Sequence, residues 1–474
     1  MSYFGTSSRK LFSALGPEKK GYRRSFGWYD AKMPRASSFT FASYEVDAVR
    51  SIITFTYRVE FQSGRVRTYS DRLILPDVTP EAWEKVPKAV LEPTLQALLL
   101  MIGINYWCVY PSRDMRIEGF TLTRAQARFW DSIYLNGLGE FFYDMQMDFH
   151  NLIAFPHDDS TAAPTPARFV LPARALLLNG AGKDSVLSAE MLKASGTPFD
   201  FFAFAPTPAH KRIAALVGSK TVRANRRRDP RVSAMMGLFG VSNAYPSVST
   251  FTFIATLLAE LLGYNSIIFS NERSADFGNL TYLGLPVNHQ WCKSSEAEKL
   301  INDYIQCYIT SDIATASLLR EYSELEIVRR FVRYPQYLRY VTSCNSYFWL
   351  PRPVQHMSRT AYWCKQCPKC VFLFACFATY LPKREVVDMF GADLYAEKRL
   401  LPLVRSILGI EGFKPLDCVG EPEEMILAMH YAALRKEYAG EPAMLLFDER
   451  FPSNYDFERL AKKVFVDGGM GKAF

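Results

Sequence analysis

Histidine and long apolar runs are scarce in this chain of 474 residues. Six histidines are present, and the first residues, 1–12, contain no apolar core of a secretory signal. The most apolar stretch, 95–110, is interrupted by Gln96, Gly103 and Asn105, which favours a buried helix over a membrane span. We therefore expect a cytoplasmic protein with no membrane partner.

Regular cysteine spacing, internal repeats and low-complexity tracts are also missing. The nine cysteines are an odd number, and only one group of them is closely spaced. Such usage in a long chain argues against an extracellular disulfide framework. It is typical of a reducing compartment, with the closely spaced group holding a metal.

No strong excess of either charge is present. The 56 basic and 48 acidic residues give a net charge of +8, which is mild for this length. A small anionic substrate suits this balance as well as RNA does, so the charge does not choose between them. Apolar residues make up 49% of the chain, a globular composition that can bury cores. The length allows about two to four domains.

Four segments follow from changes in composition and periodicity. Residues 53–61 alternate between apolar and polar positions, and 65–75 return as the second strand of a hairpin. Residues 159–167 have the composition of a linker. The segments we expect are a basic, partly disordered arm (1–38), an α+β domain (39–167), an α/β domain (168–343) and a helical region (344–474).

Short apolar runs alternate with helical patterns in the third segment. This order predicts a parallel sheet with helices on both faces, the α/β class. The strands we expect are 175–178, 199–205 and 266–270, and the helices are 183–194, 208–217 and 248–262. A basic segment, 220–231, interrupts the pattern, and it is either a surface for RNA phosphates or a solvated loop.

A glycine-rich loop, 180–185, joins the first of these strands to the first helix. Glycines let backbone N–H groups converge on phosphate oxygens, and the helix N-terminus adds partial positive charge. The spacing is neither G-x-x-x-x-G-K-[ST] nor G-x-G-x-x-G. It resembles the Ser-Gly-Gly-x-Asp-Ser signature of the PP-loop ATP pyrophosphatases, which implies ATP and Mg²⁺. Gly180 stands in the place of the serine and Ala181 in the place of the first glycine.

The loop also has alternatives at single positions. An ordinary turn between strand and helix would contain small residues too. Ala181 is tolerated if its φ angle is negative. Lys183 contacts a phosphate or is solvated, and Asp184 is linked to magnesium or caps the helix.

Three cysteines follow one another at C-x₂-C-x₂-C spacing late in the chain, and a fourth lies twenty residues earlier. Four thiolates close a tetrahedral shell around zinc, and a closed shell is structural. An iron–sulfur cluster is the competing interpretation, and three cysteines without metal is another. The 7-cyano-7-deazaguanine synthases, which are PP-loop enzymes, carry a comparable site. The ligands we expect are Cys344, Cys364, Cys367 and Cys370.

Further short stretches, taken together in this order, resemble one family, the UDP-N-acetylmuramoyl-L-alanyl-L-glutamate epimerases of bacterial peptidoglycan synthesis. The resemblance runs from about residue 40 to the end. The stretches that carry it are 137–143, 270–275, 278–279, 287–290, 293–294, 323–325, 343–345, 367–370 and 414–421.

The resemblance implies ATP-dependent inversion of the terminal L-Glu of UDP-MurNAc-L-Ala-L-Glu. An acyl-adenylate removes the carboxylate charge and makes the neighbouring Cα–H acidic enough for a base, with AMP and pyrophosphate released. It implies that the second segment lies on the substrate side, that the third is a PP-loop domain, and that a UDP-MurNAc-L-Ala:L-Glu ligase acts alongside.

Individual roles are expectations with alternatives. Arg273 clamps a phosphate or carboxylate, or forms a structural ion pair. His289 carries a proton or is a core histidine, and Cys418 is a thiol acid/base or a buried structural cysteine. Lys293 neutralises phosphate or is solvated. The catalytic residues we expect are Asp184, Arg273, His289 and Cys418, and the nucleotide-binding residues are Gly180, Ala181, Gly182, Lys183, Asp184, Ser185, Asn271 and Glu272.

Two other functions compete with this one. A PP-loop enzyme that modifies tRNA or a nucleobase would use the basic segment 220–231 on RNA phosphates. No separate RNA-binding module is visible, so we expect no nucleic-acid partner. A scaffold with a degenerate nucleotide loop is the other competitor, and only Gly180 and Ala181 favour it.

Overall fold

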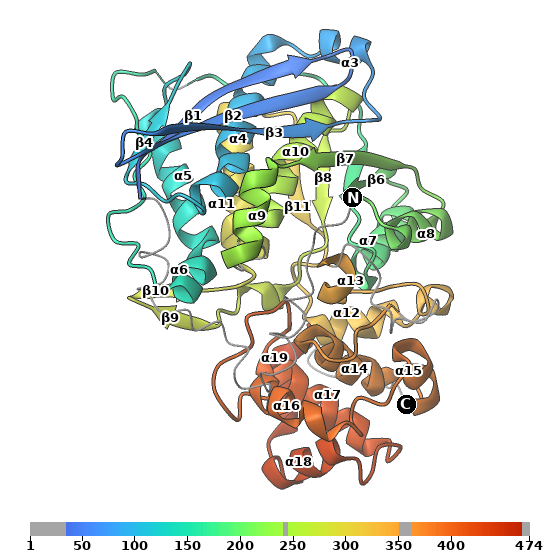
Figure 1. The fold of residues 1–474 in the computed structure, drawn as a ribbon. Helices are drawn as coiled ribbons and strands as arrows, with labels where there is room; N and C mark the ends of the chain where they lie inside the picture. The colour runs from blue at the N-terminus through green and yellow to red at the C-terminus, as the bar shows by residue number, and fades with distance from the viewer. Residues whose placement is uncertain (1–34, 163, 240–244, 350–361, 467–474) are drawn as a thin grey trace, which may run out of the picture.

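The computed structural model describes residues 35–162, 164–239, 245–349 and 362–466. Its centre is one nine-stranded sheet in the order β11-β8-β5-β6-β7-β3-β2-β1-β4 (Figure 1). Most of the predicted arm, 1–34, lies outside the described residues. The strands are β1 (Ala36–Asp47), β2 (Ile52–Phe61), β3 (Val66–Ile74), β4 (Asp114–Ile117), β5 (Ala175–Leu178), β6 (Phe199–Phe204), β7 (Thr221–Arg227), β8 (Ser266–Phe269) and β11 (Ala314–Ser317), with a separate hairpin of β9 (Leu280–Tyr282) and β10 (Leu285–Val287).

The five strands from β11 to β7 are parallel, and helices cover both faces of this part. Leu176 and Phe202 point into a core shared with helix α10 (Ser247–Leu262). Leu177 and Phe201, their neighbours in sequence, point into a second core with α7 (Lys183–Ala194) and α8 (Pro208–Val217). This alternation is the mark of a strand buried on both sides, and it confirms the predicted parallel sheet with helices on both faces.

The basic segment 220–231 does not interrupt the sheet, so that prediction is wrong. Its residues form β7, which pairs in parallel with β6 and antiparallel with β3. Arg226 is buried and contacts the buried Asp71 on β3 at 2.7 Å. The other arginines of this segment that pair with carboxylates are Arg223, with Asp77, and Arg231, with Asp229. The alternation of apolar and polar residues is hard to recognise in the sequence of β7, because Arg226, one of its buried side chains, is a charged residue paired with Asp71.

The strands β1, β2 and β3 form an antiparallel meander joined to the parallel part through β3 and β7. Alternate residues of β2, such as Ile53, Phe55 and Tyr57, are fully buried, which confirms the predicted hairpin. They lie against α4 (Lys88–Trp107), which is the one helix among the described ranges long and apolar enough to cross a membrane. Most of α4 is buried, as we expected for residues 95–110.

The C-terminal part of the chain is helical and is drawn in orange and red in Figure 1. In the C-terminal part α14 packs against α17, and Cys376 of α14 is fully buried there, as predicted. The remaining helices are α3 (Pro80–Lys85), α5 (Arg124–Gly137), α6 (Gly139–Met145), α9 (Pro230–Phe239), α11 (Ser295–Tyr308), α12 (Glu324–Phe331), α13 (Asn345–Trp349), α14 (Pro368–Tyr380), α15 (Lys383–Phe390), α16 (Leu401–Ile407), α17 (Pro422–Leu434), α18 (Pro442–Arg450) and α19 (Phe457–Val464).

Candidate functional site

The glycine-rich loop leaves the end of β5 and enters α7 at Lys183, as predicted. The Oδ1 atom of Asn179 accepts a hydrogen bond of 2.8 Å from the backbone N–H of Ala181. Ser185 is turned inward, and its Oγ donates to the carbonyl of Gly182 at 3.1 Å. The free N–H groups of the first turn of α7 therefore face the end of the parallel strands, where ligands of open α/β sheets bind.

Ala181 has a φ angle of +55°, in the left-handed region. The condition under which we expected this residue to be tolerated is therefore not met. A non-glycine residue costs about 1–2 kcal/mol there, because its Cβ approaches the following carbonyl oxygen. The buried methyl group and a 3.1 Å hydrogen bond from the N–H of Thr342 to the carbonyl of Ala181 hold this conformation.

Lys183 is buried rather than solvated. Its Nζ lies 2.5 Å from Oδ1 of Asp184 and also forms an ion pair with Glu324, the first residue of α12. Burial lowers the pKa of Lys183, but the two carboxylates outweigh burial and raise it. Burial raises the pKa of Glu324 to about 7, with Lys183 acting against the rise. The Lys183 ammonium is thus a buried charge with two carboxylate partners beside the loop. The charge of a bound ligand can change these two contacts.

Asn271 and Glu272 follow the end of β8 and are both buried, at the same sheet edge as the loop. Burial raises the pKa of Glu272, but nearby ammonium groups outweigh burial and lower it. These ammonium groups, in decreasing order of effect, are Lys293, Lys369 and Lys183. Buried carboxylates and ammonium groups therefore lie together at this edge of the sheet, beside the loop.

Cys418 and His289 lie together although 129 residues separate them. The ligand atoms of the two residues are within 4.8 Å of each other and of a carboxylate oxygen of Asp417. Nζ of Lys293 donates to Sγ of Cys418 at 3.3 Å. Nδ1 of His289 lies 2.5 Å from Oε2 of Glu140 on α6.

The charges around this pair favour a thiolate beside an imidazolium. Burial raises the pKa of the Cys418 thiol, but Lys293, then Lys369 and His289, lower it to about 6. Burial lowers the pKa of His289, but Glu140 and Cys418 raise it well above its usual value. A sulfur already balanced by an ammonium and an imidazolium is better suited to proton transfer than to a divalent cation.

Arg273 does not join these groups. Its Nη2 donates to the backbone carbonyls of Lys463 at 3.0 Å and Val464 at 2.8 Å, at the C-terminus of α19. Cationic groups stabilise helix C-termini by satisfying their last carbonyls. The structure therefore uses this guanidinium to fix the C-terminal helix rather than to hold a substrate group.

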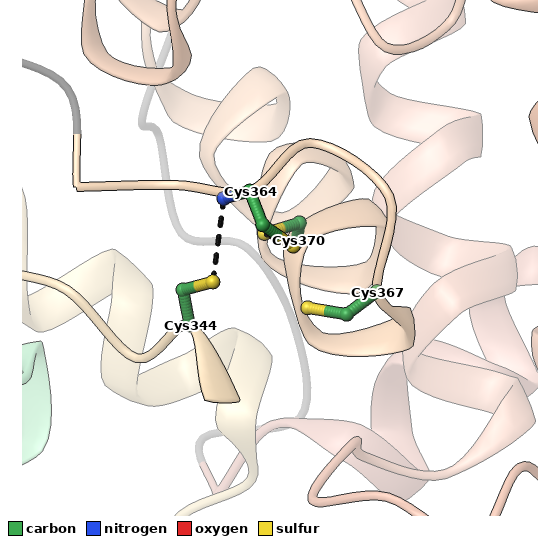
Figure 2. A group of neighbouring side chains, drawn as sticks. All are labelled: Cys344, Cys364, Cys367 and Cys370. Atoms are coloured by element: carbon green, nitrogen blue, oxygen red, sulfur yellow. Dashed lines mark hydrogen bonds between the residues drawn. The ribbon is translucent and has the colours of Figure 1, made fainter. Parts of the chain in front are cut away.

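The four cysteines predicted as ligands come together beside the loop. Their sulfur atoms are within 4.8 Å of one another and converge on one point in Figure 2. Sγ of Cys364 and Sγ of Cys370 are 3.7 Å apart, and the N–H of Cys364 donates to Sγ of Cys344 at 3.3 Å. Sulfurs placed tetrahedrally around zinc would be about 3.8 Å apart, so the donor set fits a structural zinc ion.

Several residues of the cluster escaped the sequence analysis as site residues. Glu324 and Glu140 pair with residues more than 140 positions away, which no local pattern reveals. Lys369 lies inside the cysteine motif, whose pattern assigns no role to the residues between the cysteines. The available signal for the two glutamates was their place at a helix start, Glu324 at α12 and Glu140 at α6, where acidic residues are common for local reasons.

The comparisons with known proteins point to one family over most of the chain. Residues 31–318 match the MurL N-terminal domain and residues 340–461 the MurL C-terminal domain. Three curated relatives carry the name UDP-N-acetyl-alpha-D-muramoyl-L-alanyl-L-glutamate epimerase. The protein of Micromonospora sp. is 31% identical over 92% of this chain and 96% of its own length. Those of Salinispora tropica and Xanthomonas oryzae pv. oryzae are each 30% identical, over 92% and 87% of this chain and 94% and 89% of their own lengths. The chain therefore belongs to the family of UDP-N-acetyl-alpha-D-muramoyl-L-alanyl-L-glutamate epimerases.

Proposed function

We propose that this protein inverts the terminal L-Glu of UDP-MurNAc-L-Ala-L-Glu to D-Glu through an acyl-adenylate, with release of AMP and pyrophosphate. The observation that carries the proposal is the Cys418 and His289 pair, which lies among the same buried charges as the loop at the start of α7. The family membership supports the epimerase activity. The neighbouring loop supports the ATP-dependent step.

In the nucleotide half of the site the PP-loop supplies the pyrophosphate pocket. The N–H groups at the start of α7 and the ammonium of Lys183 face phosphate oxygens, which is the usual chemistry of helix N-termini. Asp184 is 20% exposed at its side chain, so it can leave Lys183 and bind Mg²⁺ with the phosphates. Mg²⁺ held by Asp184 would supply charge balance for cleavage between the α- and β-phosphates.

In the proton-transfer half the thiolate of Cys418 takes the Cα proton of the activated glutamate. The imidazolium of His289, held by Glu140, gives a proton to the opposite face, which requires the glutamate to enter between it and Cys418, because their reactive atoms lie within 4.8 Å of each other without substrate. A thiolate with a pKa of about 6 is present at neutral pH, and a histidine with a raised pKa keeps its proton there. Water then releases AMP from the inverted product. The pair is matched to the task because base and acid are both in the active protonation state at once.

The reaction belongs to peptidoglycan-precursor synthesis. Its substrate is a nucleotide-linked dipeptide, and a UDP-MurNAc-L-Ala:L-Glu ligase is the partner that would supply it. ATP and a UDP-linked precursor place the reaction in the cytoplasm. Arg223 and Arg226 of β7 and Arg231 of α9 pair with Asp77, Asp71 and Asp229, which leaves fewer basic groups of this segment for RNA phosphates.

The test is an incubation of the protein with ATP, Mg²⁺ and UDP-MurNAc-L-Ala-L-Glu. We expect release of pyrophosphate and conversion of L-Glu to D-Glu, measured after hydrolysis by chiral chromatography. In Cys418→Ser we expect pyrophosphate release to continue while D-Glu formation falls at least a hundredfold. D-Glu formation without ATP would contradict the adenylate. Pyrophosphate release on tRNA with unchanged L-Glu would support the competing function.

A further inference from the structure

The loop 180–185 is contacted by the segment 342–345, which lies about 160 residues later in the chain. The N–H of Thr342 donates to the carbonyl of Ala181 at 3.1 Å. Two residues later Cys344 is one of the four clustered cysteines. Its neighbour Asn345 donates to Oδ1 of Asp417 at 2.5 Å, next to Cys418. One short segment thus joins the loop, the four cysteines and the thiolate.

Ser343 occupies the closest position in this segment. A Cβ atom at Gly182 would lie 2.9 Å from the Oγ of Ser343, so only glycine allows this approach. The same Cβ position is 3.8 Å from a carboxylate oxygen of Asp184, so the Ser343 hydroxyl and the Asp184 carboxylate lie on the same side of Gly182. In the part of the chain that the structure describes, this hydroxyl has no hydrogen-bond partner.

The four clustered cysteines, the segment 342–345 and the residues between Cys364 and Cys370 are called the four-cysteine unit below. Lys369 belongs to the part of this unit that contains Cys364, Cys367 and Cys370. It lies between Cys367 and Cys370 on the first turn of α14, and it is 93% buried, with a relative exposure of 7%. Over the described ranges its ammonium has neither an ion pair nor a hydrogen bond. Its charge lowers the pKa of Glu272, Glu324 and Cys418, so these three groups lie within its electrostatic reach. The residue is buried while its ammonium keeps contact with solvent, so an anionic ligand can reach it.

We propose that Ser343 and Lys369, both carried by the four-cysteine unit, complete the phosphate site of the loop 180–185. Ser343 supplies the hydroxyl donor for which this loop has Gly180 instead of serine, and Lys369 supplies a second ammonium beside Lys183. The ligand class is an inorganic pyrophosphate or nucleoside triphosphate with Mg²⁺. The inference rests on the nucleotide half of the proposed function. The cysteine unit is therefore part of the anion site and not only a support of the fold.

The test measures binding of Mg²⁺-pyrophosphate and Mg²⁺-ATP by isothermal titration calorimetry. We expect Ser343→Ala and Lys369→Met each to weaken binding by about tenfold or more, because a hydrogen bond to a charged group contributes about 1.5–3 kcal/mol. Lys365→Met is the matched control, since Lys365 lies between Cys364 and Cys367 in the loop just before α14 and is partly exposed. We expect the control to bind as wild type does.

A second variant separates a lost donor from a disturbed fold. A Cβ at Gly180 would meet nothing within 4 Å, and its backbone is outside the left-handed region, so serine fits there. We expect Gly180→Ser to restore most of the affinity that Ser343→Ala loses. Zinc content and the urea midpoint of every variant are recorded alongside, and equal values show that the cysteine unit is intact.

The outcomes distinguish this inference from the proposed function. Wild-type protein that binds ATP and pyrophosphate, with unchanged affinity in Ser343→Ala and Lys369→Met, would overturn the inference alone. Absence of binding in wild type would overturn both. Loss of affinity in Ser343→Ala that Gly180→Ser does not restore would assign Ser343 a structural role and would contradict its part in the site.

Discussion

Nζ of Lys293 lies 3.3 Å from Sγ of Cys418, and this contact sets the acidity of the thiol. Because the pKa of Cys418 is lowered to about 6, the thiolate is lost only as the pH falls through 6. We expect the rate of epimerisation to fall on the acid side with that midpoint. Lys293→Met removes the charge that stabilises the Cys418 thiolate most. The midpoint of the acid side of the pH profile should therefore move upward by about one pH unit or more.

The thiolate can be measured without activity. A brief pulse of iodoacetamide at a series of pH values, followed by mass spectrometry of the Cys418 peptide, reports the ionised fraction. Lys299→Met is the control, because Lys299 is exposed on α11 and pairs only with Asp303. A wild-type midpoint above 8 would contradict the assignment of Cys418 as the base.

Glu140 keeps His289 protonated, so its removal should shift the other side of the pH profile. Burial alone lowers the pKa of His289, and the carboxylate reverses this effect. In Glu140→Gln we expect the pKa of His289 to fall, which leaves it neutral at pH 7 and lowers activity about tenfold or more. The nearby Asp144, whose pKa burial and Glu140 raise to about 7, should become more acidic in the same variant.

The measurement is an NMR titration with ¹⁵N-labelled histidine, in which the ring nitrogens of His289 report its protonation directly. The six histidines make assignment by single substitution practical. Asp148→Asn is a matched control, because Asp148 pairs with the exposed His150. A His289 resonance that titrates near 6.5 in wild type would remove the imidazolium from the mechanism.

Local patterns predict the elements of this fold well and their partners poorly. The helix expected at 183–194 has those bounds in the structure, because the glycine before it and the short apolar run of the preceding strand are local signals. The sequence does not indicate strand β7, because an arginine is typical of the surface and Arg226 is buried only through its ion pair with Asp71 on β3. Burial of Arg226 depends on a contact across 155 residues, which no periodicity encodes.

The candidate site divides in the same way. Cys418 and His289 could be named from residue type, but their juxtaposition and their opposite pKa shifts come from Lys293 and Glu140, which reach them through the fold. Arg273 was named from its place after a strand, and the C-terminus of α19 claims its guanidinium. Position after a strand predicts proximity to the site, and it does not predict where a long side chain points.

Lys183 and Glu324 form a buried ion pair whose halves depend on each other. We expect Lys183→Met to destabilise the fold by about 3–5 kcal/mol, since it leaves Glu324 buried without its partner. The double variant Lys183→Met/Glu324→Gln should recover most of that loss. Urea unfolding of the two single variants and the double variant gives the coupling free energy. Additive losses would show that the two side chains do not interact.

Ala181 tests how much the left-handed loop conformation costs. Ala181→Gly removes a penalty of about 1–2 kcal/mol but adds freedom to the unfolded chain and deletes a buried methyl group. We expect its free energy of unfolding to stay within about 1 kcal/mol of wild type. Ala181→Val keeps the positive φ of +55° with a branched side chain in a fully buried position, and should destabilise by about 2–4 kcal/mol. Urea unfolding measures both changes, and equal stability of the valine variant would contradict the φ assignment.

The four-cysteine unit should hold one zinc ion per chain, because four sulfurs converge with spacing that a tetrahedral ion requires. Plasma mass spectrometry of protein purified without chelator measures the content, and iron with visible absorption would instead indicate a cluster. Cys367→Ser should lose the ion and lower the unfolding midpoint, since metal binding is coupled to folding. Cys307→Ser, at an exposed cysteine outside the unit, should keep both. Because Lys369, which lies between Cys367 and Cys370, lowers the pKa of Cys418, loss of zinc should also raise the apparent pKa of Cys418 in the alkylation assay.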